Sequence, residues 1–262
     1  NLSYVLPTLL FETLGTKQYI NETDDSMQKY AYIYKYDGLN RCIYKKLPGC
    51  DPVYYIYDKA GRLIFSQDGE QRLKGEWTFT IPDVFGRTVL SGTCKNSLTY
   101  TAAPLKDVLV KATWGNVTNS YMGYTLTGIT LTTPVILSAT YYDNYDFISK
   151  NSVPSTLAYT AASGYGVRST ADPKGLPTGT VTARLGASGA SGYLYASMYY
   201  DNRGRMIQSK STNHLAGRDE EYLNLNFTGQ PTNRKLVHTA TGKTTQTEVY
   251  SYQYDLSLLP IR

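Results

Sequence analysis

Histidine and cysteine are scarce in this sequence, whose 262 residues contain two histidines and three cysteines. Cys42, Cys50 and Cys94 form no C-x-x-C pair and have no histidine at ligand spacing, which argues against a zinc site or a dithiol redox centre. A disulfide between Cys42 and Cys50, across adjacent strands, is one alternative in an oxidising compartment. The sequence favours free thiols that are partly buried.

Long apolar runs and the common catalytic motifs are also absent. No stretch of about 18 apolar residues is present, so we predict no membrane-spanning segment. The sequence contains no G-x-S-x-G elbow, H-E-x-x-H helix, phosphate-binding loop or dinucleotide fingerprint. His214 and His238 have no obvious serine or cysteine partner in the sequence. We therefore predict that the protein is not an enzyme and has no catalytic residue, cofactor or metal site.

The charges are spread along the chain. There are 26 Lys and Arg and 21 Asp and Glu, which gives a formal net charge of +5, and no basic run resembles a nucleic-acid-binding arm. We predict no nucleic-acid partner. Tyrosine is abundant, with 26 copies against 6 Phe and 2 Trp. Because tyrosine joins an apolar ring to a polar hydroxyl and has a high strand propensity, this bias indicates sheets whose faces are only half covered.

A short motif recurs along the chain. The stretch "YKYDGLNRCI" at 34–43 is followed by "YIYDKAGRLI" at 55–64, "IPDVFGRTV" at 81–89 and "YYDNRGRMI" at 199–207. A further copy, "YYDNYDFI" at 141–148, lacks the glycine and the arginine. Repetition of this kind predicts one small structural unit that is used several times.

Each part of the motif has a role in a β-hairpin corner. The aspartate suits the first position of a type I turn, the fourth residue needs a positive φ, and the arginine begins the return strand where it can pair with the aspartate or lie on a tyrosine ring. Asparagine or aspartate substitutes for glycine in two copies. The predicted turn residues are Asp37, Asn40, Arg41, Asp58, Gly61, Arg62, Asp83, Gly86, Arg87, Asp143, Asp146, Asp201, Gly204 and Arg205.

The motif predicts an all-β fold of antiparallel hairpins that form a long, twisted or curled sheet with few or no helices. Expected strands in the second half are 180–185, 193–200, 205–209, 222–228 and 234–239. Short helical turns are expected only at Lys106–Ala112 and Ser211–Glu220. We divide the chain into four segments. Residues 1–29 are a lead-in segment that pairs with the sheet edge or frays, and residues 30–98 are hairpins that carry the motif. Residues 99–180 are an intervening β segment with Gly/Ser/Pro-rich loops, and residues 181–262 are a second hairpin segment, truncated at its C-terminus.

The pattern Y-x-Y-D-x-x-G-R-L resembles the YD repeats of the Rhs (rearrangement hotspot) family. The stretches "IYKKLPGCDPVYYIYDKAGRLIFSQDGE", "EWTFTIPDVFGRTVLSGTC" and "MYYDNRGRMIQSKS" are similar to Rhs-type repeat proteins of gut Bacteroidetes, and the resemblance spans roughly residues 28–255. It implies a ribbon of hairpins that forms an extracellular or envelope-associated scaffold or shell, which encloses a C-terminal toxin in some members. The implied partners are the remaining repeats of a parent chain. The sequence begins at Asn1 and stops within a sixth motif at Tyr252–Asp255, so we expect a piece of such a chain.

Aromatic side chains offer an alternative function. Trp77, Trp114, Tyr55 and Tyr57 could stack on sugar rings, which would make the chain a surface-adhesion or carbohydrate-binding module with a cell-surface glycan as its partner. Tyrosines two residues apart are also what cross-strand packing within a sheet requires. We favour the packing role and a structural function.

Overall fold

The computed structural model describes residues 2–8, 10, 12, 21–115, 121–186 and 192–254. Strands dominate these residues, which confirms the prediction of an all-β fold, and no described helix is long and apolar enough to cross a membrane. The helical elements are α2 (Asp25–Tyr30), α3 (Gly69–Lys74), η1 (Tyr100–Ala102) and η2 (Ser155–Leu157). The strands are β1 (Leu2–Val5), β2 (Tyr32–Tyr36), β3 (Cys42–Lys46), β4 (Val53–Tyr57), β5 (Leu63–Gln67), β6 (Trp77–Pro82), β7 (Thr88–Cys94), β8 (Lys111–Trp114), β9 (Tyr124–Thr127), β10 (Val135–Tyr142), β11 (Pro177–Ala183), β12 (Tyr193–Tyr200), β13 (Met206–Thr212), β14 (Arg218–Leu225), β15 (Pro231–His238) and β16 (Gln246–Ser251).

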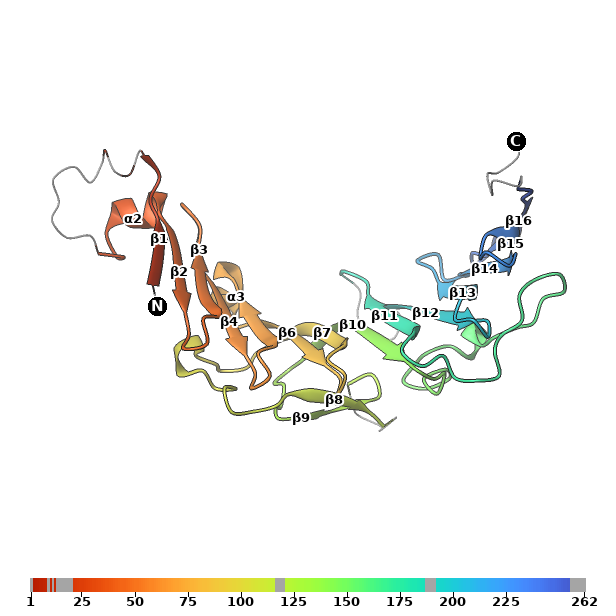
Figure 1. Ribbon diagram of the computed structural model, residues 1–262, viewed down its shortest axis with the longest axis horizontal. Helices are drawn as coiled ribbons and strands as arrows, with labels where there is room; N and C mark the ends of the chain where they lie inside the picture. The colour runs from red at the N-terminus through yellow and green to blue at the C-terminus, as the bar shows by residue number, and fades with distance from the viewer. Residues whose placement is uncertain are drawn as a thin grey trace. The chain divides into compact units, whose positions relative to one another are not determined.

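The chain divides into two compact units, each of which is described by itself. The first unit contains Asn1–Thr113 and Leu126–Ile136, and the second contains Trp114–Thr125 and Leu137–Arg262. In the first unit, β1 to β7 pair antiparallel with their neighbours in chain order (Figure 1). In the second unit, β10 to β16 follow the same rule. Strands β1 to β7 and β10 to β16, called the first and the second sheet below, are therefore each a meander in which one strand is joined to the next by a turn or a connection.

One face of the first sheet is covered by the connection that follows β7. Strand β6 alternates buried and half-buried residues, and it directs Trp77, Phe79 and Ile81 into the core. The connection crosses the sheet and places the ring of Tyr100 4.2 Å from that of Tyr54. The N–H of Lys59 donates to the carbonyl of Val108 (2.9 Å), so the backbone of the connection is also fixed to the sheet. The core thus lies between a sheet and an irregular segment.

The second sheet is covered in the same way by residues 143–176, between β10 and β11. The carbonyl oxygen of Leu157 accepts hydrogen bonds from Ser197 Oγ and Tyr199 Oη, both at 2.7 Å. Phe147 packs on Gly179, where a Cβ would come within 2.2 Å of the phenyl ring. Only glycine leaves room for this close approach. The Gly/Ser/Pro-rich segment is therefore a packed cover, and the units consequently differ from the sequence segments that we drew at 99–180 and 181–262.

The helices lie where the sequence did not place them. Lys106–Ala112 runs from a turn into β8, and Ser211–Glu220 is a corner between β13 and β14, so neither becomes a helix. Helix α3 is instead set by local capping: the Asp68 carboxylate accepts from the N–H of Gln71 (2.8 Å), and Gly75 ends the helix with a φ of 63°. The D-x-x-Q pattern at Asp68 was a readable signal that we missed.

The predicted strands lie close to their expected positions. The span 193–200 is the same in the prediction and the structure, and the other four strands differ at their ends. Strand β1 of the lead-in segment pairs with β2. Residues 187–191, which lie between the expected strands 180–185 and 193–200, and Asp255 of the sixth motif are outside the described residues.

Candidate functional site

Four of the predicted corners share one set of hydrogen bonds. At Asp37, Asp58, Asp83 and Asp201, one carboxylate oxygen accepts from the backbone N–H of the arginine four residues on, at 2.9 Å in each case. The other oxygen accepts from the Nε of that arginine at 2.7–3.0 Å. The fourth residue has a positive φ in every corner: 60° at Asn40 and 72–85° at the three glycines Gly61, Gly86 and Gly204. The aspartates are thus part of hairpin corners.

The environment of three of the corner carboxyls keeps them ionised. Burial raises the pKa of Asp37, Asp58 and Asp201, but hydrogen bonds from the backbone and from the paired arginine outweigh burial, so the pKa of each lies below its ordinary value. A general acid in a glycosidase needs the opposite shift. These three carboxylates are therefore suited to holding arginine.

The arginines also link one corner to the next. Arg41 Nη1 donates to the carbonyl of Asp58 (3.1 Å), and Arg205 Nη1 donates to the carbonyl of Asn226 (2.8 Å). Arg62 reaches the carbonyl of Val110 in the covering connection. The guanidinium of Arg41 lies 5.0 Å from the centre of the Tyr57 ring. The planar guanidinium, with its several fixed donors, makes these simultaneous contacts possible.

Two further corners were missed by the sequence analysis. At Asn226 and Asn213 the side-chain amide oxygen replaces the carboxylate and accepts from the backbone N–H four residues on, at 2.9 Å in both corners. The fourth residues, Gly229 and Ala216, again have positive φ. Gln230 stands where the arginine would be and accepts from Asn226 Nδ2 (3.1 Å). Asn226 begins an N-x-x-G pattern and Asn213 an N-x-x-A-G pattern, and both lack the aspartate and the arginine on which our alignment depended.

The prediction of a hairpin corner at Asp143–Asp146 is wrong. Asp143 itself has the positive φ (73°), and Asp146 does not. The Asp143 carboxylate accepts from the N–H of Gly175 (2.6 Å), at the far end of the covering connection. Because the sequence here lacks both the glycine and the arginine, the chain leaves the sheet at this point. The aspartate then joins the two ends of the connection between β10 and β11.

The aromatic residues proposed for ligand stacking are not gathered into one platform. Trp77 is only 2% exposed and packs edge-on against Phe65, so a stacking role for this residue is wrong. Trp114 is half-buried and packs edge-on against Tyr124 and Tyr141. Tyr57 donates its hydroxyl to the carbonyl of Cys42 (3.0 Å), and both Tyr55 and Tyr57 are half-buried in β4. Three of the four therefore keep some exposure, but they lie on separate elements or within the packing of the sheet.

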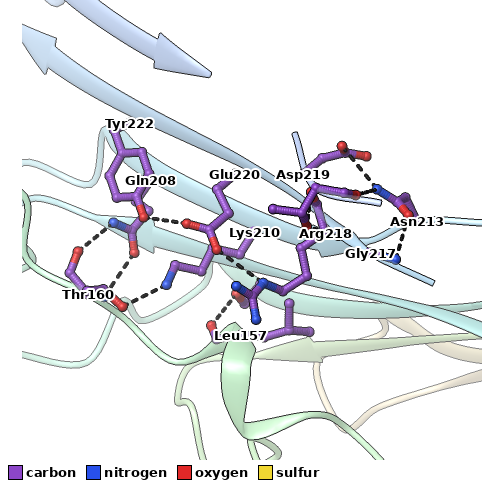
Figure 2. A network of polar contacts seen from close by, with 12 residues as sticks. Leu157, Thr160, Gln208, Lys210, Asn213, Gly217, Arg218, Asp219, Glu220 and Tyr222 are labelled. Carbon is purple, nitrogen blue, oxygen red and sulfur yellow. Dashed lines mark hydrogen bonds and ion pairs between the residues drawn. The ribbon is translucent and has the colours of Figure 1, made fainter. Parts of the chain in front are cut away.

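A polar network lies beneath the cover of the second unit (Figure 2). Lys210 is 3% exposed, and its Nζ donates to Thr160 Oγ1 (2.7 Å). Gln208 donates to the carbonyl of Thr160 (2.8 Å), and the Glu220 carboxylate accepts from Tyr222 Oη (2.5 Å). Burial lowers the pKa of Lys210, although Glu220 acts against that shift. Nothing in the composition indicated this network, because Thr160 lies 48 and 50 residues before the strand residues Gln208 and Lys210 that it contacts.

The described ranges contain neither a cluster of metal-ligating side chains nor a disulfide. No group of three or more His, Cys, Asp or Glu residues is close enough to hold a metal ion there. Cys42, Cys50 and Cys94 are all free thiols, and burial raises the pKa of Cys94. His238 Nδ1 lies 2.5 Å from Asp219 Oδ1, whereas His214 is exposed in the Asn213 corner. The described histidines thus offer one exposed pair with a carboxylate.

Comparison of the sequence with protein families and with curated proteins finds no match. The functional argument therefore depends on the geometry of the corners, the covers and the network described above.

Proposed function

We propose that this chain is a non-enzymatic structural segment of a larger Rhs-type, YD-repeat protein. It contributes β-hairpins to an extracellular or envelope-associated scaffold, or to a shell that encloses a toxin. The observation that carries this proposal is the linkage between corners, in which the arginine of one hairpin also holds the backbone of the next. Arg41 does this in the first unit, and Arg205 does it in the second.

Hydrogen bonds between neighbouring corners suit a structural role, because they hold adjacent hairpins together. A hydrogen bond to a charged group contributes about 1.5–3 kcal/mol when it is buried. The side chains of Arg41 and Arg205 are 18% and 28% exposed, so we assign about 1 kcal/mol to each bond between corners. Each of these two bonds has to break before the hairpin that it joins can open separately from its neighbour. The ion pair within each corner holds the arginine in place, and in two corners the same arginine also joins neighbouring hairpins.

The alternative of a carbohydrate-binding module has less support at the residues first proposed for it. Sugar stacking requires an exposed ring face, and Trp77 lies in the core. The rings of Tyr55 and Tyr57 belong to a strand in the middle of a sheet. An adhesive role would need a different surface.

Native-state proteolysis of the whole chain by thermolysin tests the structural role. Arg41→Lys and Arg205→Lys keep the charge but lose the second donor, so cleavage through local opening should become about five- to tenfold faster, which corresponds to about 1 kcal/mol. Arg234→Lys is the matched control, because Arg234 pairs with Glu221 on a strand face and links no corners. Unchanged cleavage in both corner variants, or digestion of the wild type at the rate of an unfolded chain, would contradict the proposal.

Electron microscopy of the parent protein tests the larger claim. We expect these residues to be part of a continuous β wall. A separate module that projects from a different architecture would exclude the scaffold.

A further inference from the structure

The corners at Asp37, Asp58 and Asp83, called the first, second and third corners here, lie at the same end of the first sheet. They join β2 to β3, β4 to β5 and β6 to β7, and in an antiparallel meander every second turn is at the same end of the strands. Neighbouring strands are about 4.8 Å apart, so consecutive corners of this set are about 10 Å apart. We call this end of the sheet the corner rim.

Large apolar side chains are exposed along the corner rim. Leu39 in the first corner is 72% exposed, and Val84 and Phe85 in the third corner are 67% and 76% exposed. Leu109 of the covering connection is 49% exposed, and both of its neighbours in the chain are hydrogen-bonded to the second corner. Each of the three corners therefore has an exposed apolar side chain in it or beside it.

The fold of the corner does not require apolar side chains at these positions. The two residues after the aspartate are Lys59 and Ala60 in the second corner. They are Asn202 and Arg203 in the corner at Asp201 of the second unit. In the first and third corners the aspartate accepts from the backbone N–H two residues on, at 2.9 Å in both. The turn thus fixes the backbone whatever the side chain, and the exposed apolar side chains need a separate explanation.

Lysines accompany the apolar side chains on the corner rim. Lys59 is exposed in the second corner. Lys106 and Lys111 lie on either side of Leu109 in the covering connection, with Asp107 as the only carboxylate between them. The three corner aspartates are each paired with an arginine and so add no net charge. The corner rim therefore combines exposed apolar side chains with a surplus of positive charge.

We propose that the corner rim binds to the surface of a membrane that contains anionic lipid. Segments that bind a membrane interface insert Leu and Phe side chains about 5–10 Å deep, to the boundary between head groups and acyl chains, while Lys and Arg attract anionic head groups. Leu39, Leu109 and Phe85 are suited to insertion. Lys59 and Lys106 are suited to the head groups.

The spacing of the side chains favours a membrane over a protein partner. A stable protein interface buries about 800 Å² on each side around a contiguous apolar core. The corner rim instead offers separate apolar side chains, about 10 Å apart along one end of a sheet. A fluid bilayer surface can accept each of them independently. This inference goes beyond the structural role proposed above, which makes no use of the exposed apolar side chains.

Co-sedimentation of the whole chain with lipid vesicles tests the proposal. One set of vesicles contains equal parts of phosphatidylcholine and phosphatidylglycerol, and the other contains phosphatidylcholine alone. Leu39→Ser and Phe85→Ser should each weaken binding to the mixed vesicles about fivefold to tenfold, because each removes an apolar side chain from the interface. Lys59→Gln should weaken binding to the mixed vesicles about fivefold and change binding to phosphatidylcholine by less than about twofold.

Helix α3 supplies matched controls, because the connection from β5 to β6 lies at the opposite end of the strands. Leu73 is 82% exposed in this helix, and Lys74 follows it. Leu73→Ser and Lys74→Gln should change binding to the mixed vesicles by less than about twofold. Phe85→Trp adds a reporter whose emission should shift to shorter wavelength with mixed vesicles, whereas Leu73→Trp should show no shift.

Circular dichroism checks that each variant is folded, and the emission of Phe85→Trp still decides the matter if a serine variant is not. Absence of binding to the mixed vesicles, equal loss in Leu73→Ser and Phe85→Ser, or an unchanged emission of Phe85→Trp would overturn the proposal. Dimerisation that depends on concentration and is lost in Leu39→Ser and Phe85→Ser, without vesicle binding, would show that a second copy covers the corner rim and would also overturn it.

Discussion

The Asp58–Arg62 pair gives the sharpest test of how the corners work. The carboxylate of Asp58 is fully buried, whereas the other three corner aspartate side chains are 10–17% exposed. It accepts from Arg62 Nη2 at 2.6 Å and from Nε at 3.0 Å. Asp58→Asn keeps an oxygen for the backbone N–H of Arg62 but removes the charge that holds the guanidinium. Breaking a buried pair costs about 3–5 kcal/mol, and since Arg62 remains 24% exposed we expect about 2 kcal/mol.

Another corner of the protein indicates a second substitution that should compensate for the loss of stability in Asp58→Asn. At the Asn226 corner, an asparagine and Gln230 stand in the two positions and share a neutral hydrogen bond of 3.1 Å. The double variant Asp58→Asn/Arg62→Gln reproduces that pair in the first unit. It removes the unpaired charge and restores one neutral hydrogen bond, so we expect it to recover about 1 kcal/mol of the loss.

Urea unfolding monitored by tryptophan fluorescence measures both effects. The chain has two tryptophans, of which Trp77 belongs to the first unit and Trp114 to the second. A Trp114→Phe background therefore makes Trp77 the only tryptophan reporter. A loss of about 2 kcal/mol lowers the urea midpoint by about 1 M for an m-value of about 2 kcal/mol/M. Asp25→Asn, at a residue whose side chain is 81% exposed, is the control and should change the unfolding free energy by less than about 0.5 kcal/mol.

Two outcomes would refute this account of the corners. If Asp58→Asn unfolds at the same urea concentration as the wild-type background, the buried carboxylate contributes no net stability. If the double variant is less stable than Asp58→Asn, the asparagine–glutamine pair does not substitute for the charged one, and the similarity between the two kinds of corner is only one of shape.

Three other predictions follow from the same contacts. Because the pKa of Asp58 is lowered in the fold, the ionised carboxylate stabilises the folded state above the unfolded pKa of about 3.9, and this contribution is lost as the pH falls through the folded pKa. In acid titrations the unfolding free energy of the wild type should therefore fall more steeply below about pH 4 than that of Asp58→Asn. Gly179→Ala should lower the unfolding free energy by about 1–3 kcal/mol, because the new Cβ would meet the ring of Phe147, whereas Gly38→Ala, with open space around it, should change it by less than about 0.5 kcal/mol in the same urea assay. Lys210→Met should leave the unfolding free energy at pH 7 within about 1 kcal/mol of the wild type. Because the pKa of Lys210 is lowered in the fold, the wild type should gain stability as the pH rises toward 10.5, and the variant should lack this gain.

The corners could be predicted from the sequence because their chemistry is local. An aspartate side chain reaches backbone N–H groups two and four residues on, and the required positive φ restricts the fourth residue mainly to glycine or asparagine. The burial of Trp77 also had a signal, since Trp77, Phe79 and Ile81 alternate along a single strand. The all-β class followed from these short-range patterns.

The covers and the buried polar network could not be predicted in this way. Phe147 meets Gly179 across a segment whose small and polar residues indicate only a surface loop. Lys210 contacts Thr160 because the cover lies across the sheet that contains β13, although nothing near either residue in the sequence indicates this contact. Contacts of this kind depend on how the whole sheet folds, and a single sequence contains no local pattern for them.

Several tyrosines of the second unit donate hydrogen bonds to backbone carbonyls, in the cover and in the strands. Each buried carbonyl requires a donor. Tyr199 donates to the carbonyl of Leu157 (2.7 Å), Tyr200 to that of Pro177 (2.6 Å) and Tyr145 to that of Met198 (3.0 Å). Burial raises the pKa of Tyr199 and Tyr200, so both hydroxyls stay protonated and keep donating at neutral pH. Phenylalanine would fill the same space but would lose these three hydrogen bonds, so at these positions the packing requires tyrosine.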